Sequence, residues 1–121
     1  MRIKLVENET DLARCLDFFK RVNINVLPYS TLFYIEDNNE IVCSAGYHKD
    51  WGAMLEPMYS ENSIRGIKAG KEMYEFMELY FKLLGHSIIR FRSKFEPLID
   101  LMEKHYGFKK QDLETYLIKE V

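Results

Sequence analysis

Residues 57–70 read PMYSENSIRGIKAG and join an extended segment to a long amphipathic one. Residues 53–59 are predicted to form a strand. After them, apolar residues recur at helical spacing: Ile67, Met73, Phe76, Met77, Tyr80, Phe81 and Leu84. A strand, a loop holding Gly66 and Gly70, and a helix direct unpaired N–H groups and the positive end of the helix dipole to one place. That arrangement suits a phosphate or pyrophosphate, although an ordinary strand-to-helix turn has the same pattern.

Length and composition predict one domain that spans residues 1–121. The net charge is −2, so we expect no nucleic-acid partner. The sequence has neither a long apolar run nor a signal peptide, which favours a soluble, cytoplasmic protein without membrane attachment. The two cysteines, Cys15 and Cys43, stand singly in apolar patterns and are expected to be reduced core residues. No Cys/His cluster predicts a metal site.

The N-terminal segment predicts a strand, a helix and a loop. Residues 1–7 alternate in polarity, and Asn8 is expected to cap a helix that ends near Val22. Residues 23–30 lack a period and contain Pro and Asn, so they are predicted to be a loop. This loop carries several apolar residues, including Tyr29. It either seals an edge of the core or forms one wall of a substrate pocket.

Three strands are expected in the middle of the chain. Two β-rich runs, 31–36 and 41–48, flank a group of turn-forming residues and predict a hairpin. Residues 53–59 extend the hairpin to an antiparallel meander. Pro57 has no N–H to donate, so the third strand must be interrupted or lie at an edge there.

The C-terminal half predicts a helix, a strand, a second helix and a final strand. The first helix covers 67–84 and the strand 87–93, and residues 93–96 have the form of a capping box that opens the second helix. Gly107 ends that helix, with Phe108 packed back against it, and residues 113–120 form the last strand. The expected buried stripe of the second helix comprises Leu98, Leu101, Met102 and His105.

This order predicts an α/β or α+β domain with a mixed sheet and helices on both faces. An antiparallel meander is followed by a βαβ crossover, in which the 67–84 helix joins two adjacent parallel strands. Pro57 and the glycine-bearing loop predict that these two strands splay apart beyond Pro57.

Two motifs and the element order resemble the GNAT superfamily of N-acetyltransferases. Residues 65–70, Arg-Gly-Ile-Lys-Ala-Gly, resemble the family's Arg/Gln-x-x-Gly-x-Gly/Ala pyrophosphate loop. Residues 103–108, Glu-Lys-His-Tyr-Gly-Phe, are similar to the helix end that precedes the family's final strands. The resemblance covers nearly the whole chain and implies an acetyl-CoA-dependent transferase that acts on a primary amine.

The resemblance also implies site residues. Glu56 would be a carboxylate base that contacts the amine, the N–H groups of Met58 and Tyr59 would polarise the thioester carbonyl, and Tyr106 would be the acid. Tyr29 would contact the acceptor. The pyrophosphate of acyl-CoA would lie over residues Arg65, Gly66, Ile67, Lys68, Ala69, Gly70 and Lys71. Glu56 as a solvent-facing strand residue and Tyr106 as a packing residue remain alternatives.

Two departures from the family pattern keep other functions open. Lys68 stands where the earlier glycine is usual, and Met102 replaces the tyrosine that often acts as general acid. A catalytically inactive GNAT-fold protein that binds a partner or ligand is therefore the second hypothesis. A small interaction module without a cofactor is the third. The sequence does not name the acceptor amine, and it leaves a homodimer open.

The loop also gives a mutational prediction. N–H groups of residues 67–70 are expected to be unpaired because they open a helix, and a side chain at Gly70 would occupy the volume of the phosphates. Gly70→Asp is then expected to abolish CoA binding while the fold persists.

Overall fold

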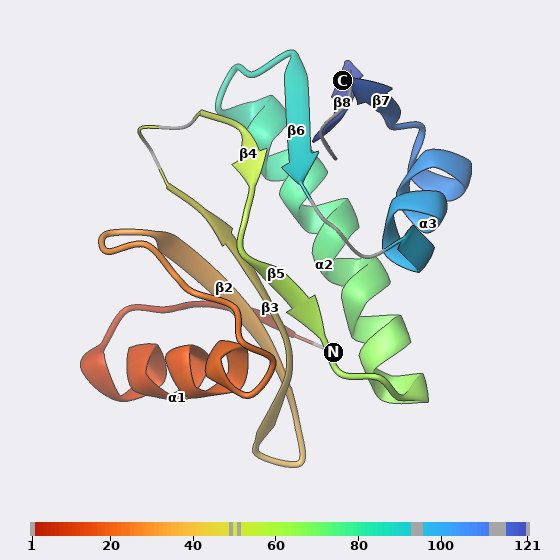
Figure 1. The fold of residues 1–121 in the computed structure, drawn as a ribbon. Coiled ribbons are helices and arrows are strands. Elements are labelled where there is room, and N and C mark those ends of the chain that lie inside the picture. The colour runs from red at the N-terminus through yellow and green to blue at the C-terminus, as the bar shows by residue number, and fades with distance from the viewer. Residues whose placement is uncertain (1, 49, 51, 93–95, 112–115, 121) are drawn as a thin grey trace.

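A computed structural model describes residues 2–48, 50, 52–92, 96–111 and 116–120. The elements appear in the predicted α+β order, with two additional short strands (Figure 1). They are β1 (Ile3–Leu5), α1 (Glu9–Lys20), β2 (Thr31–Asp37), β3 (Glu40–Tyr47), β4 (Met54–Leu55), β5 (Met58–Ser60), α2 (Ile64–Leu83), β6 (Ile88–Arg92), α3 (Glu96–Tyr106), β7 (Lys109–Gln111) and β8 (Tyr116–Glu120).

The strands form two four-stranded sheets. One has the order β1-β2-β3-β5 and is antiparallel throughout. The other has the order β4-β6-β8-β7, in which β4 and β6 are parallel and the other pairs are antiparallel. The predicted meander and parallel crossover are both confirmed. The predicted final strand, 113–120, is instead preceded by β7, with which β8 pairs; residues 112–115 lie outside the described residues.

Helices α1 and α2 cover opposite faces of the first sheet. Successive strand residues point to opposite faces, and β2 uses both: Leu32 and Tyr34 pack with α1, whereas Phe33 belongs to the core beneath α2. The cap of α1 is the predicted one, because Asn8 Oδ1 accepts from the N–H of Asp11 at 2.8 Å. In the turn of the β2–β3 hairpin, Asn38 and Asn39 both have positive φ, as a two-residue hairpin turn requires.

Helix α2 begins three residues earlier than predicted. Ser63 is its N-cap, and its Oγ accepts from the N–H of Gly66 at 3.0 Å. Ile67 and Leu84, which were expected on the apolar face, are 71% and 50% exposed. The buried face consists of Gly66, Ala69, Met73, Tyr74, Met77 and Phe81. Gly85 follows the helix with φ +93°, a left-handed conformation that favours glycine at a helix end.

The buried face of α3 differs from the prediction. Ile99 and Met102 are its fully buried residues, while Leu101 is 42% exposed and His105 is also exposed. Leu98 and Met102 face the core as predicted, Leu101 and His105 do not, and the prediction missed Ile99. Phe108 does fold back onto the helix, with its N–H 3.2 Å from the carbonyl oxygen of Met102. The predicted capping box at 93–96 falls mainly on residues outside the described part of the chain.

Cys15 and Cys43 are free and fully buried, as predicted. Burial raises the pKa of the Cys43 thiol to about 12 and that of Cys15 to about 11, so both remain protonated at neutral pH. No helix in the described part of the chain is long and apolar enough to cross a bilayer.

Candidate active site

The two sheets separate between β4 and β5. Leu55 is the last residue of β4 and pairs with Phe91 of β6, whereas β5 begins at Met58 and pairs only with β3 among the described strands. Pro57 lies between them and cannot donate to either ladder. The prediction that these strands splay apart beyond Pro57 is therefore confirmed (Figure 1).

One edge of β5 faces this separation. Gly46 N–H donates to the carbonyl oxygen of Pro57 at 2.9 Å, and Glu61 N–H donates to Val42 at 2.8 Å. In an antiparallel pair, the backbone N–H and C=O groups of successive residues point alternately toward the partner strand and away from it. The backbone groups of Tyr59 accordingly face β3.

The alternation gives β5 a free edge made of Met58 and Ser60. Their N–H and C=O groups point away from β3, toward the separated side. Of the two predicted donors, Met58 can reach a ligand there and Tyr59 cannot. Sequence reasoning missed Ser60, although counting alternate residues from Met58 would have included it.

Glu56 lies at the interruption and forms an ion pair. Arg92 Nη2 donates to Glu56 Oε1 at 2.9 Å, so Glu56 lies on the same face of the sheet as Arg92. The other carboxylate oxygen, Oε2, is buried and has no hydrogen-bond partner in the described part of the chain. Glu56 therefore combines one oxygen held by Arg92 with a second, buried oxygen that has no described partner, in a side chain that is 30% exposed. The role of Arg92 was missed because alternating charge on a strand is typical of a solvated face.

The first turn of α2 holds Arg65 among carboxylates. Arg65 donates to both oxygens of Glu61, at 2.8 and 2.9 Å, and lies 3.4 Å from Asp37 Oδ2 and 3.3 Å from Glu40 Oε1. The hydrogen bonds from Arg65 and then from Ser63 lower the pKa of Glu61 to about 2. Sequence reasoning missed these carboxylates, which fix the arginine that the resemblance assigns to pyrophosphate.

The two glycines of the loop face the protein's own chain. A Cβ on Gly66 would lie 1.8 Å from the carbonyl oxygen of Glu61. A Cβ on Gly70 would lie 3.0 Å from Ser60 Oγ, and that hydroxyl donates to the carbonyl oxygen of Gly66. Both glycines thus permit close packing of α2 on the end of β5. For this reason Gly70→Asp would disturb packing as well as any ligand.

The prediction of unpaired N–H groups at residues 67–70 is wrong at its first position. Because Ser63 caps the helix, the N–H of Ile67 already donates to the carbonyl oxygen of Ser63 at 2.9 Å. The next three residues lie deeper in the helix. The exposed N–H groups of the first turn belong to Ile64 and Arg65 instead.

The side chains of residues 67–71 point in different directions. Ala69 is fully buried, whereas Ile67, Lys68 and Lys71 are exposed. The two lysines supply positive charge near the start of α2 without carrying a described ion pair. They are the cationic side chains of the predicted pyrophosphate segment that remain available to a ligand.

Tyr106 packs on α2, whereas Tyr29 is exposed. Tyr106 is the last residue of α3 and stacks on Tyr74 of α2, with ring centroids 4.1 Å apart. Burial, and secondarily the charge of Glu75, raises the pKa of Tyr106 above its usual range, which keeps its hydroxyl protonated. Tyr29 is 90% exposed, and its contact with an acceptor stays a prediction. No cluster of metal-binding side chains occurs among the described residues.

The fold has close counterparts among solved structures. An aminoglycoside 6'-acetyltransferase type Ii superposes with a TM-score of 0.74 at 15% identity, over 99% of this chain and 97% of that one. An acetyltransferase of the GNAT family from Staphylococcus aureus Mu50 gives 0.70 at 14% identity, covering 98% and 99%. The protein has the GNAT acetyltransferase fold. YhhK from E. coli, bound to coenzyme A, gives 0.64 at 12% identity over 100% of both chains.

The sequence comparisons found no match. No protein-family profile matches the chain, and no curated protein matches it either. The likeness to the GNAT structures is therefore a likeness of fold.

Proposed function

We propose that this protein is an acetyl-CoA-dependent N-acetyltransferase that acts on a primary amine of a small molecule or protein. The observation that carries the proposal is the free edge of β5, Met58 and Ser60, which opens onto the separation between β5 and β6 directly beside Glu56. An extended ligand with amide groups can pair with such an edge as an additional strand would.

The start of α2 offers a site for the pyrophosphate of acetyl-CoA. The N–H groups of Ile64 and Arg65 and the helix dipole favour an anion, by about 0.3–1 kcal/mol for the dipole. Lys68 and Lys71 add positive charge. The carboxylates around Arg65, those of Asp37, Glu40 and Glu61, repel an anion. Binding therefore requires that the phosphates either displace Glu61 from Arg65 or bind beside that ion pair.

The transfer forms one C–N bond and breaks one C–S bond. The free amine attacks the thioester carbonyl, the tetrahedral intermediate expels the CoA thiolate, and the nitrogen gives up one proton while the thiolate takes one. Holding the two reactants together supplies most of the rate. The Met58 N–H polarises the carbonyl oxygen, and Glu56 Oε2 accepts the proton of the amine.

Tyr106 is the remaining predicted catalytic residue. It is protonated, as an acid must be, but its ring packs on Tyr74. We propose that solvent protonates the thiolate, because the ring of Tyr106 is held against Tyr74. Tyr106→Phe then keeps full turnover, and a loss of turnover without loss of stability would restore Tyr106 as the acid.

A second function is favoured by the two ion pairs. Arg65 is held by carboxylates and Glu56 by Arg92, so both the family's anion-binding arginine and the candidate base are already occupied in part. This pattern fits a GNAT-fold protein that binds a partner or ligand without acyl transfer.

Thermal unfolding in the presence of acetyl-CoA separates the two functions. A ligand at 100 times its Kd adds about 2.7 kcal/mol to the free energy of unfolding. We expect acetyl-CoA and CoA to raise the Tm and acetyl-CoA to release free thiol when an acceptor amine is present. A rise in Tm without thiol release across a broad set of amines would favour the second function, and no rise would refute CoA binding.

A further inference from the structure

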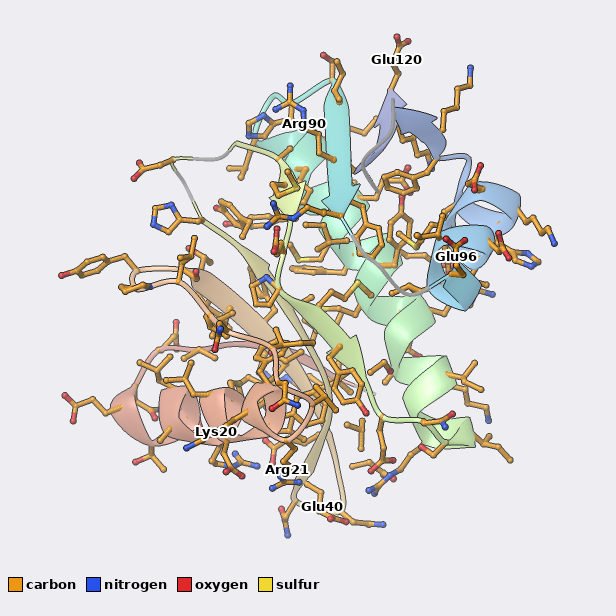
Figure 2. The ribbon with its side chains drawn as sticks, in the orientation of Figure 1. Lys20, Arg21, Glu40, Arg90, Glu96 and Glu120 are labelled. Carbon is orange, nitrogen blue, oxygen red and sulfur yellow. The ribbon has the colours of Figure 1, made fainter. Side chains whose placement is uncertain are left out.

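Two arginines project from the face of β6 that α2 does not cover. Ile89 and Phe91 are buried in the core beneath α2, so the alternate residues Arg90 and Arg92 point to the opposite face. Figure 1 shows α2 behind β6, with no helix in front of β4 and β6 in the part of the chain that the structure describes. Arg90 can be followed on β6 in Figure 2. This face is continuous with the candidate site, because Arg92 contacts Glu56.

Arg90 differs from Arg92 in having no ion-pair partner within the part of the chain that the structure describes. Arg92 is engaged with Glu56 at 2.9 Å. Among the described residues, no carboxylate lies within ion-pair distance of Arg90, which is exposed. Residues two apart on a strand are separated by about 6.7 Å. A free guanidinium therefore stands one strand repeat from the arginine that fixes Glu56.

The charges on this face sum to a positive value. Lys109 and Arg90 both pair with Ile118 of β8, so Lys109 lies on the same face of the sheet as Arg90. Glu120 pairs with Ile88, which is two residues before Arg90 on β6, so Glu120 lies on that face too. Together with Arg90, Arg92 and Glu56 the described side chains carry three positive and two negative charges. Arg92 and Glu56 neutralise each other, so the excess comes from Arg90 and Lys109, which only Glu120 opposes among these side chains.

We infer that the acceptor is a small amine that carries an anionic group, a carboxylate or a phosphate, a few bonds from the reacting nitrogen. This inference rests on the proposed transferase function. The amine contacts the free oxygen of Glu56, and the anionic group binds the guanidinium of Arg90, a planar group suited to either anion. A polyamine or an aminoglycoside would bring further positive charge against Arg90 and is disfavoured.

Paired substrates test the inference directly. Initial rates are measured with acetyl-CoA for glycine against glycinamide, glutamate against its diamide, and O-phosphoethanolamine against ethanolamine, each corrected for the fraction of free amine. Spermidine and kanamycin represent polycations. We expect kcat/KM to be at least tenfold higher for the anionic member of a pair. The first two pairs report a carboxylate and the third reports a phosphate.

Charge reversal at Arg90 tests the role of this residue, and the same change at Lys20 is the control. Arg90→Glu should raise KM for the anionic amine at least tenfold, leave kcat within twofold, and improve kcat/KM for spermidine. Lys20→Glu makes the same change in net charge on α1, far from Arg90 in Figure 2, and should alter neither value. Equal effects of the two variants would overturn the inference.

The outcomes distinguish this inference from the function beneath it. A wild-type preference for spermidine or kanamycin, or acetyl-CoA binding without acetylation of any anionic amine, overturns the acceptor class and leaves CoA binding intact. Absence of any acetyl-CoA-induced rise in Tm refutes the transferase itself, and the acceptor inference with it.

Discussion

Replacing each glycine of α2 with alanine should change stability in opposite directions. At Gly66 the new Cβ would lie 1.8 Å from the carbonyl oxygen of Glu61, where ordinary contact begins near 3.4 Å, so the backbone must move by about 1.5 Å. That backbone is fixed, because Glu61 N–H donates to Val42 at 2.8 Å. Overpacking of this kind costs about 1–3 kcal/mol. Better helix propensity offsets at most about 1 kcal/mol.

At Gly70 the balance reverses. The new Cβ meets only the side chain of Ser60, at 3.0 Å from Oγ and 3.2 Å from Cβ, so a shift of a few tenths of an ångström relieves the contact. The gain in helix propensity, about 0.8–1 kcal/mol, then leaves Gly70→Ala between neutral and stabilising. For a domain of this size 1 kcal/mol corresponds to roughly 4 °C in Tm. We expect Gly66→Ala to melt well below the wild type and Gly70→Ala at or above it.

Thermal unfolding by circular dichroism measures both variants, with Lys68→Ala as control. Lys68 is exposed on the same helix, and lysine and alanine have similar propensities. Equal losses at Gly66 and Gly70, or a neutral Gly66→Ala, would refute the packing argument. Gly70→Ala should also keep its affinity for CoA. If it melts normally and loses CoA binding, the glycine faces the ligand as the sequence motif implies.

Three further predictions concern the ion pairs and the helix cap. Glu56→Gln should lower kcat by about 10²-fold or more with the affinity for acetyl-CoA nearly unchanged, as measured by steady-state kinetics and titration calorimetry; unaltered turnover and pH profile would exclude Glu56 as the base. Glu61 has a folded-state pKa lowered to about 2 from 4.5, so it stabilises the fold above pH 4.5 and that contribution is lost as the pH falls toward 2. Urea unfolding of Glu61→Gln between pH 2 and 6 should show a weaker fall in stability on acidification than the wild type, and a parallel curve would contradict the assignment. Ser63→Ala should cost about 1 kcal/mol, because the N–H of Gly66 loses its acceptor, whereas Ser63→Thr keeps a hydroxyl that can accept from Gly66 and donate to Glu61 and should retain most of the stability; equal melting of the two variants would argue against capping.

Local backbone chemistry accounts for what the sequence predicted well. Asn8 has a side-chain oxygen that suits a helix N-cap, and Asn38 and Asn39 tolerate positive φ. Pro57 lacks an N–H, which predicts the interruption between β4 and β5 whatever the rest of the chain does. These features depend on one or two residues and their neighbours. The element order and the separated strands could therefore be read from the sequence.

The site depended on approaches between distant segments. Gly66 and Gly70 fit a phosphate-binding motif, yet their backbones are approached by residues 60 and 61 of β5 and the following turn. Arg65 fits the same motif, but carboxylates from the β2–β3 turn surround it. Helical spacing also cannot fix the phase of a short stripe, which is how Ile99 was missed on α3. Each error concerns what packs against a residue rather than which element holds it.

The free edge of β5 has a consequence for self-association. Unpaired strand edges recruit strands from other molecules and so promote aggregation, unless the edge is short or is flanked by residues that prevent pairing. The strand that carries this edge has only three residues, Met58–Ser60, with Pro57 before it and Glu61 after it. A foreign strand would gain few hydrogen bonds and would meet both flanking residues. A site open to a narrow amide-bearing ligand is in this way poorly suited to nucleating fibrils.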